Sequence, residues 1–238
     1  MNHQLAALID DLKATHGRNL ASVTLYGSAA AGDYVPERSD QNILIALKEI
    51  TPLELRNAHA AIREWVRLGH SVPVYFTVSE LQEAADVFAI EFHQMEAARR
   101  VLYGTDVLAA LDVSHEAMRR QLEYELRTKL IRLRRQYIPA SMSVDGLKGL
   151  MADSLASFAA LFRALLVLKG LTPPTHKREV VALTVQHFDL NGMPFEKIFH
   201  IRENNFGENL DEASANQLFG EYMKQIETVI EAVDKLEE

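Results

Sequence analysis

Two apolar runs joined by a Gly-Ser turn and a polar loop form the feature that most constrains the fold of this chain. They lie within Leu25–Leu47, where a short apolar run, a turn, a polar loop and a second apolar run follow one another. The pattern predicts a strand over Ser22–Tyr26, a tight turn at Gly27 and a second strand over Ile43–Leu47. Glycine carries no Cβ, so Gly27 fits a turn in which the backbone approaches a ligand closely.

Polar residues stand at the entry to the second strand, in the order Ser-Asp-Gln-Asn. Side chains two residues apart on a strand point to the same face, so Asp40 and Asn42 are expected to share one site, with Gln41 on the other face. Mg²⁺ takes oxygen ligands of the kind that carboxylates and amides supply. Because the amide of Asn42 carries no charge, it attracts a divalent ion less strongly than a second carboxylate would.

This order and spacing resembles the signature of the polymerase-beta-like nucleotidyltransferase superfamily. The resemblance implies that Gly27, Ser28 and Ser39 bind the nucleotide and that two carboxylates at Asp-x-Asp spacing hold the metal. Asp40 stands at the first of these positions and is the expected catalytic residue, whereas Asn42 replaces the second carboxylate. The resemblance also implies Mg²⁺ as cofactor and a nucleoside triphosphate, such as ATP, as substrate.

Active members of the superfamily supply a third carboxylate from the strand that follows the long helix. The corresponding strand, Val72–Thr77, carries no acid, and Tyr75 is expected at the place of that carboxylate. Glu91 stands among apolar residues, where a carboxylate must be paired, protonated or bound to a metal, so it is a candidate third metal ligand. The alternative is that Glu91 pairs with Arg99 or Arg100, or lies on a solvated face.

The rest of the first half is predicted to complete an α+β domain with a small mixed sheet. Apolar residues at helical spacing alternate along the chain with short apolar runs, as is typical of this class. An α+β domain is therefore expected over residues 1–106, and the resemblance implies that it is nucleotidyltransferase-like. The expected helices are Gln4–Thr15, Pro52–Leu68 and Ser79–Phe88 (with Ser79 as its cap), the third strand is Val72–Thr77, Phe88–Met95 fits either class, and Val101–Gly104 closes the domain.

Residues 114–238 are predicted to form an all-α helical bundle domain, with the boundary in Thr105–Ser114. Ser114–Ile138 repeats apolar residues every three or four positions, which indicates an amphipathic helix that ends before Pro139. Val144–Lys169 is apolar nearly all round and is the expected central helix. A bundle after such a domain resembles the layout of the kanamycin nucleotidyltransferase class, which implies that it helps to bind the acceptor and mediates a homodimer.

Three arginines, Arg120, Arg127 and Arg134, repeat every seven residues and share one helix face. Such a face could meet a triphosphate or RNA, or it could be solvated and salt-bridged by neighbouring glutamates. The net charge of −8 argues against broad nucleic-acid binding.

Composition and the chain's start favour a cytoplasmic protein with no membrane partner. There is no cysteine, which excludes disulfides and thiolate metal sites. The first residues lack a basic region followed by an apolar run, so no signal peptide is expected. The most apolar stretch, Leu155–Leu168, is shorter than a bilayer span.

Two functions of different classes fit these patterns. The first is Mg²⁺-dependent transfer of a nucleoside monophosphate from ATP or another triphosphate to a hydroxyl group on a small-molecule or protein acceptor. The second is a catalytically inactive nucleotidyltransferase fold that senses nucleotides or binds proteins. Asn42 and the acid-free strand favour the second function, whereas Gly27, Ser28 and Asp40 favour a surviving nucleotide contact.

Overall fold

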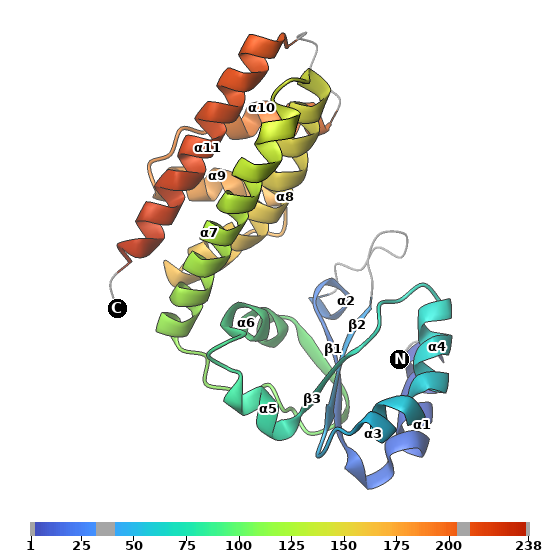
Figure 1. Cartoon of the computed structure of the whole chain (residues 1–238). Coiled ribbons are helices and arrows are strands. Elements are labelled where there is room, and N and C mark those ends of the chain that lie inside the picture. The colour runs from blue at the N-terminus through green and yellow to red at the C-terminus, as the bar shows by residue number, and fades with distance from the viewer. Residues whose placement is uncertain (1–2, 32–40, 204–209, 237–238) are drawn as a thin grey trace. The chain divides into compact units, whose positions relative to one another are not determined.

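A computed structural model describes residues 3–31, 41–203 and 210–236 of the chain. The chain divides into two compact units, Met1–Ser114 and His115–Glu238. The first unit contains a four-stranded sheet with helices, and the second is helical (Figure 1). This confirms the predicted α+β class with a helical bundle after the sheet.

The sheet of the first unit is mixed, with strand order β3-β2-β1-β4. The central strand β1 pairs antiparallel with both β2 and β4, and β2 pairs parallel with the edge strand β3. The strands are β1 (Leu20–Tyr26), β2 (Asn42–Leu47), β3 (Val74–Thr77) and β4 (Arg99–Gly104). The last of these extends the predicted closing run by two residues towards the N-terminus.

Helices cover both faces of this sheet (Figure 1). Because side chains alternate along a strand, β2 contributes Ile43 and Ile45 to one apolar cluster and Leu44 and Ala46 to the other. The first cluster includes α1 and Trp65 of α4, and the second includes α5 and α6. The helices are α1 (His3–His16), α2 (Ser28–Ala31), α3 (Pro52–Asn57), α4 (His59–Arg67), α5 (Val78–Glu83) and α6 (Ala89–Ala97), with the 3₁₀ turn η1 (Gly17–Asn19) before β1.

Local hydrogen bonding corrects two predictions in this unit. The expected single helix Pro52–Leu68 is divided into α3 and α4 at Ala58, whose ψ is −11°. The cap of α5 is Thr77 and not Ser79. The Thr77 hydroxyl accepts from the Glu80 amide at 3.0 Å, and the Glu80 carboxylate accepts from the Thr77 amide at 2.7 Å. This reciprocal pair is a capping box, which Ser79 lies too far along the chain to form.

The second unit has five helices among its described residues. Pro139 lies inside the first of them and does not follow its end, because the Ser141 amide still donates to the Tyr137 carbonyl at 2.8 Å. A proline lacks only its own N–H, so helical bonding can resume after it. The helices are α7 (His115–Ala140), α8 (Val144–Leu168), α9 (Lys177–His187), α10 (Met193–Arg202) and α11 (Glu212–Asp234).

Helix α8 forms the core of the bundle. By length and composition alone, this helix is long and apolar enough to cross a membrane. The sequence predicts a shorter apolar stretch, Leu155–Leu168. Half of its most apolar window is buried inside the protein. Large side chains such as Phe158 and Phe162 are among its fully buried residues. This burial is what a central bundle helix requires.

A buried histidine and a glutamate join α1 to α3. The Nδ1 atom of His16 lies 2.8 Å from the Oε2 atom of Glu54, and the His16 side chain is fully buried. The His16 hydrogen bond, together with one from Asn19, lowers the pKa of the Glu54 carboxyl group below its ordinary value. The folded state therefore binds a proton at Glu54 less readily than the unfolded chain does.

We expect this contact to make the first unit sensitive to acid. A lowered pKa means that the stabilisation by Glu54 is complete above its ordinary pKa, about 4.3, and is lost as the pH falls through the lower folded value. Glu54→Gln should therefore flatten the decline in unfolding midpoint between neutral pH and pH 3. Glu49→Gln, which removes an exposed carboxylate nearby, should leave the decline in place, and an equal change in both variants would contradict the assignment to Glu54.

Candidate nucleotide site

The turn at Gly27 has the geometry that the sequence predicts. Gly27 follows β1 with φ of +76°, a region that glycine adopts without steric cost. Its amide donates to the Ala98 carbonyl at 2.9 Å, and its carbonyl accepts from the Ala30 amide at 2.9 Å. The first bond fixes the turn against the segment after α6, and the second starts α2. The Gly27 backbone is thus held in place from both sides.

Asn42 lies directly beside this turn. It begins β2, is half-buried and pairs with Tyr26, the residue before Gly27. A Cβ atom built on Gly27 would lie 3.3 Å from the Nδ2 atom of Asn42. The structure therefore brings together these two predicted site residues, and a side chain at position 27 would crowd the Asn42 amide.

Strand pairing adds two residues to this end of the sheet. Tyr26 pairs with Asn42 on one side and with Arg99 of β4 on the other, so the three form a row across β2, β1 and β4. Burial raises the pKa of the Tyr26 phenol, which keeps it neutral at physiological pH. The sequence signal for Tyr26 was its place at the end of a strand, but its pairing with Arg99, 73 positions later, could not be read from local pattern.

Arg99 is anchored by acidic and carbonyl groups close to it in sequence. Its Nε atom lies 2.9 Å from the Asp106 carboxylate, and its Nη1 atom donates to the Glu96 carbonyl at 2.6 Å. A guanidinium held by a carboxylate is fixed in direction and has part of its charge neutralised. Arg99 therefore serves first to fasten β4 to the segment that follows it.

The interpretation that Tyr75 occupies the place of a third carboxylate is wrong. Tyr75 packs with the cluster on the α1 side of the sheet, and its ring lies 6.1 Å from that of His16. Asn42 lies two residues before Leu44, so both side chains are on the face of the sheet opposite to that of Tyr75. Leu44 is paired with Val74 in the parallel ladder. The residues of β3 on the face of Asn42 are thus apolar, and β3 offers that face no metal ligand.

Glu91 lies in the first turn of α6 and is exposed. The C-terminal end of α6 is the end beside Gly27, since Ala98 follows the helix and accepts the Gly27 amide. Ala98 lies seven positions after Glu91, which corresponds to roughly 10 Å along the helix axis. Glu91 is therefore on the helix that borders the turn, but towards its far end.

The remaining candidate residues fall outside what the structure describes. Ser39 and Asp40 belong to the undescribed segment 32–40, and the side chain of Ser28 is likewise not described. Within residues 3–31, 41–203 and 210–236, no three His, Asp or Glu side chains form a group that could hold a metal ion. A metal site here would need Asp40 together with the Asn42 oxygen.

The fold of this chain is found in a known protein. No family model matches the chain, and no curated protein matches it in sequence. Among solved structures, the chain is similar to spectinomycin adenyltransferase AAD(9) from Enterococcus faecialis, determined with ATP and spectinomycin. The likeness covers 93% of this chain and 98% of that chain, with a TM-score of 0.56 and 15% sequence identity. The predicted nucleotidyltransferase fold is thereby confirmed.

Proposed function

We propose that this chain transfers a nucleoside monophosphate from a nucleoside triphosphate to a hydroxyl group of an acceptor. The observation that carries the proposal is the likeness to a nucleotidyltransferase over 93% of the chain, which includes both the sheet and the bundle. The turn at Gly27 adds to it, because this turn and the adjacent Asn42 lie at the strand ends where the family motif places the nucleotide.

The reaction needs few chemical groups. The acceptor oxygen attacks the α-phosphorus of the triphosphate, the bond from that phosphorus to the bridging oxygen breaks, and pyrophosphate leaves with that oxygen. The hydroxyl proton passes to a nearby base or to water. Oxygen ligands suit Mg²⁺, and Asp40 with Asn42 would hold it, whereas Glu91, roughly 10 Å along α6 from Ala98, is too distant from the Gly27 turn to be a third ligand there. When bound, the ion would stabilise the charge on the attacking and leaving oxygens.

The chain's own residues would position the phosphates. At Gly27 the absence of a Cβ atom leaves room for the Asn42 side chain, which keeps the turn close to the strand end that would hold the ion. Ser28 would offer its hydroxyl and amide as donors to phosphate oxygens, and Ser39 would contact the nucleotide from the polar loop. ATP is the proposed nucleotide and a small hydroxylated molecule the proposed acceptor, since the similar adenyltransferase was determined with ATP and spectinomycin.

A second candidate function is a catalytically inactive module that senses nucleotides or binds proteins. The observation that favours it is the apolar character of β3 on the face of Asn42, together with an amide where the family has a carboxylate. One carboxylate at the strand entry leaves a divalent ion with less charge compensation than two. In this case ATP would bind without turnover.

Restoring the missing carboxylate separates the two functions. We expect Asn42→Asp to tighten Mg²⁺-dependent ATP binding by about tenfold, which corresponds to about 1.4 kcal/mol, because a charge is added beside the ion. Calorimetric titration of ATP with and without Mg²⁺ measures the change. Release of pyrophosphate from ATP with a panel of hydroxylated acceptors, spectinomycin included, then reports turnover in the same two proteins.

Asn57→Asp is the matched control, since it adds the same charge at an exposed position in the same unit. It should leave Mg²⁺-dependent binding within about twofold of wild type, because screened surface charges act weakly over distance. Acceptor-dependent pyrophosphate release by the wild type supports the transferase. Binding of ATP without release in either protein supports the inactive module, and equal Mg²⁺ dependence in all three proteins would remove residue 42 from the metal site.

A further inference from the structure

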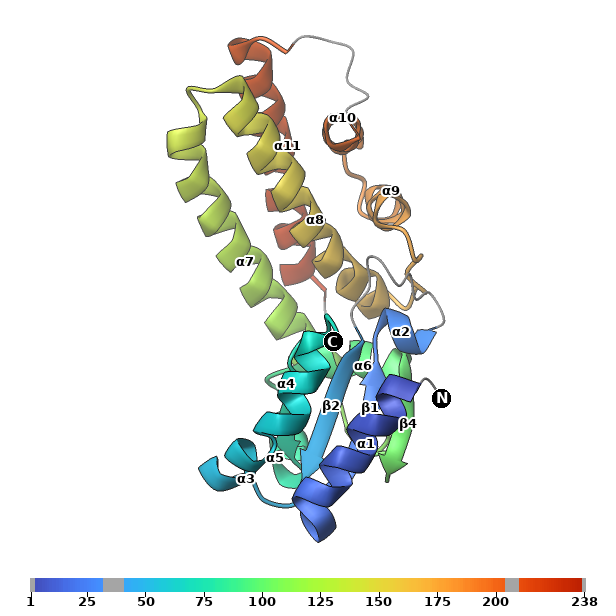
Figure 2. The same cartoon turned by 90° about the vertical axis from the view of Figure 1, so that its right-hand side faces the viewer.

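A groove of about 310 Å³ lies between α7 and α8 in the second unit. The two helices run side by side (Figure 2). Its floor is apolar and includes the buried residues Leu133 and Phe158. Its polar lining consists of Lys129, Arg132, Gln136, Asp153, Ser154 and Ser157. A groove of this size can bury a small metabolite or part of a larger ligand.

A second hollow of about 400 Å³ continues the groove along α7. The two hollows share Arg132 and Gln136, and the second adds Arg135 and Pro139. The combined lining therefore carries Lys129, Arg132 and Arg135 against one carboxylate, that of Asp153. This positive excess contrasts with the net charge of −8 of the whole chain.

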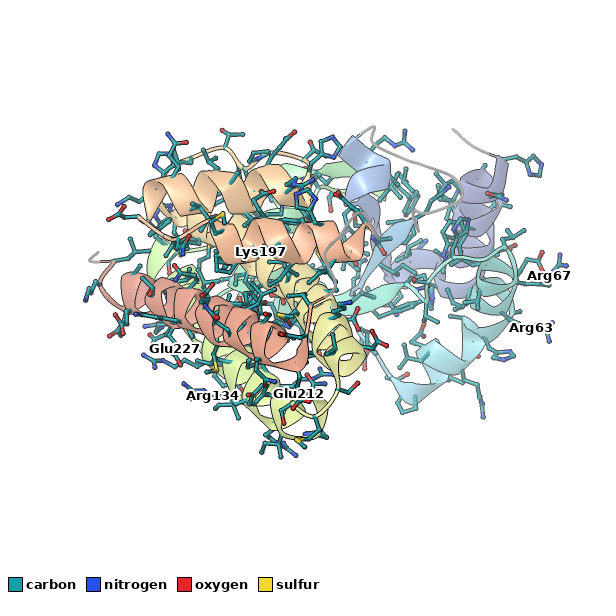
Figure 3. All side chains as sticks on the ribbon, turned by 90° about the horizontal axis from the view of Figure 1, so that it is seen from above. Arg63, Arg67, Arg134, Lys197, Glu212 and Glu227 are labelled. Atoms are coloured by element: carbon teal, nitrogen blue, oxygen red, sulfur yellow. The ribbon has the colours of Figure 1, made fainter. Side chains whose placement is uncertain are left out.

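The three cations of the groove differ from the arginines on another face of α7. Arg127 pairs with Glu123 at 2.7 Å, and Arg120 pairs with Glu116. Arg134 pairs with Glu227 of α11 at 2.7 Å, and the two side chains lie next to each other (Figure 3). The three arginines with seven-residue spacing are thus salt-bridged, which agrees with the second of the two alternatives predicted for them. Their charge is largely neutralised and has little to offer a ligand.

No carboxylate in the described part of the chain lies within 4.0 Å of the charged nitrogens of Lys129, Arg132 or Arg135. Lys129 is half-buried, whereas Arg132 and Arg135 are exposed to solvent. Their charge is not neutralised by a described carboxylate and is accessible to a ligand. The groove therefore offers positive charge to an anion that enters it.

We propose that this groove binds a small phosphate-bearing anion. Guanidinium groups donate two parallel hydrogen bonds to phosphate oxygens, and an ammonium group adds a point charge. The hydroxyl groups of Ser154 and Ser157 and the Gln136 amide supply further donors for the remaining oxygens. The apolar floor excludes water beneath the ligand, which strengthens these charged contacts. The lining residues all belong to the bundle unit, and none of them is a residue of the candidate nucleotide site.

Calorimetric titration with pyrophosphate, in EDTA so that no divalent ion is present, tests the proposal. We expect saturable binding at one site by the wild type. Arg132→Gln should weaken it at least tenfold, because Arg132 lines both hollows. Arg127→Gln is the control on the same helix and should change it less than about twofold, since that arginine is held by Glu123. Asp153→Asn should tighten binding, because it removes the one carboxylate in the groove.

Several results would overturn the proposal. Unchanged affinity in Arg132→Gln, with an unchanged melting curve, would place any pyrophosphate binding elsewhere, and so would weaker binding in Asp153→Asn. The absence of binding by the wild type would leave the groove without the proposed ligand. A single-stranded oligonucleotide that binds more tightly than pyrophosphate at equal phosphate concentration would make the groove part of a nucleic-acid surface. None of these results depends on nucleotidyl transfer, which requires its own metal-dependent site.

Discussion

Gly104→Ala is expected to destabilise the first unit by about 3–5 kcal/mol, near the upper end for a single substitution. Gly104 ends β4 with φ of +79°, where a side chain is strained. A Cβ atom at this position would lie 1.9 Å from the carbonyl oxygen of Ala21 and 2.9 Å from its carbonyl carbon. Both atoms belong to backbone, so no side-chain rotation can relieve the clash.

The backbone has little freedom to move away from Gly104. Residue 104 pairs with Ser22 in the β1–β4 ladder, and the Thr105 amide donates to the same Ala21 carbonyl at 3.3 Å. Because β1 lies between β2 and β4, a shift that accommodates the new methyl group would disturb both of its neighbours. The expected outcome is therefore loss of the β4 pairing or unfolding of the whole sheet.

Trp65 provides the measurement. It is the single tryptophan of the chain and is buried in the first unit, so its fluorescence during chemical denaturation reports on that unit alone. The control is Gly69→Ala, where φ is +92° but a Cβ atom would meet nothing within 4 Å. The control isolates backbone strain and should cost about 1–2 kcal/mol. Equal losses in the two variants would show that the contact with Ala21 is not the cause.

Local pattern was sufficient for the part of the fold that adjoins the motif. The strand before Gly27, the turn itself and the strand to Leu47 follow from apolar runs and one glycine, because strand, turn and strand are neighbours along the chain. The class of the bundle also followed, since a three-to-four-residue apolar period persists over α7 and α11. In the candidate site, the structure brings together Gly27, which the resemblance assigns to the nucleotide, and Asn42, which it assigns to the metal.

Features that depend on pairing between distant segments could not be predicted in this way. The row of Asn42, Tyr26 and Arg99 needs the register of β1 with β4, which no local pattern carries. The prediction that Tyr75 stands at the place of a carboxylate fails, because a difference of one residue in register moves a side chain to the opposite face of the sheet. The groove between α7 and α8 likewise depends on which faces of two helices meet, and the amphipathic period of each helix alone does not give this.

Asp40→Ala is expected to abolish Mg²⁺-dependent ATP binding and nucleotidyl transfer, with at least a hundredfold loss of each. Asp40 is the one carboxylate of the predicted strand-entry motif, since its partner position is Asn42. Removing it leaves an amide oxygen, which attracts a hard divalent ion far less than a carboxylate does. In a superfamily member with two motif carboxylates, one would remain. This chain has no such reserve at the motif, so the effect should be near complete.

The control is Asp33→Ala, which makes the same chemical change seven positions earlier in the same polar loop. It should leave ATP binding in the presence of Mg²⁺ within about twofold of wild type, because the motif assigns Asp33 no metal contact and a charge that does not bind the ion acts only through screened electrostatics. Both variants should keep the wild-type melting temperature within a few degrees. Retained Mg²⁺-dependent binding in Asp40→Ala would exclude Asp40 as the metal ligand. Equal loss in both variants would mean that the loop as a whole, and not one carboxylate, is what the nucleotide requires.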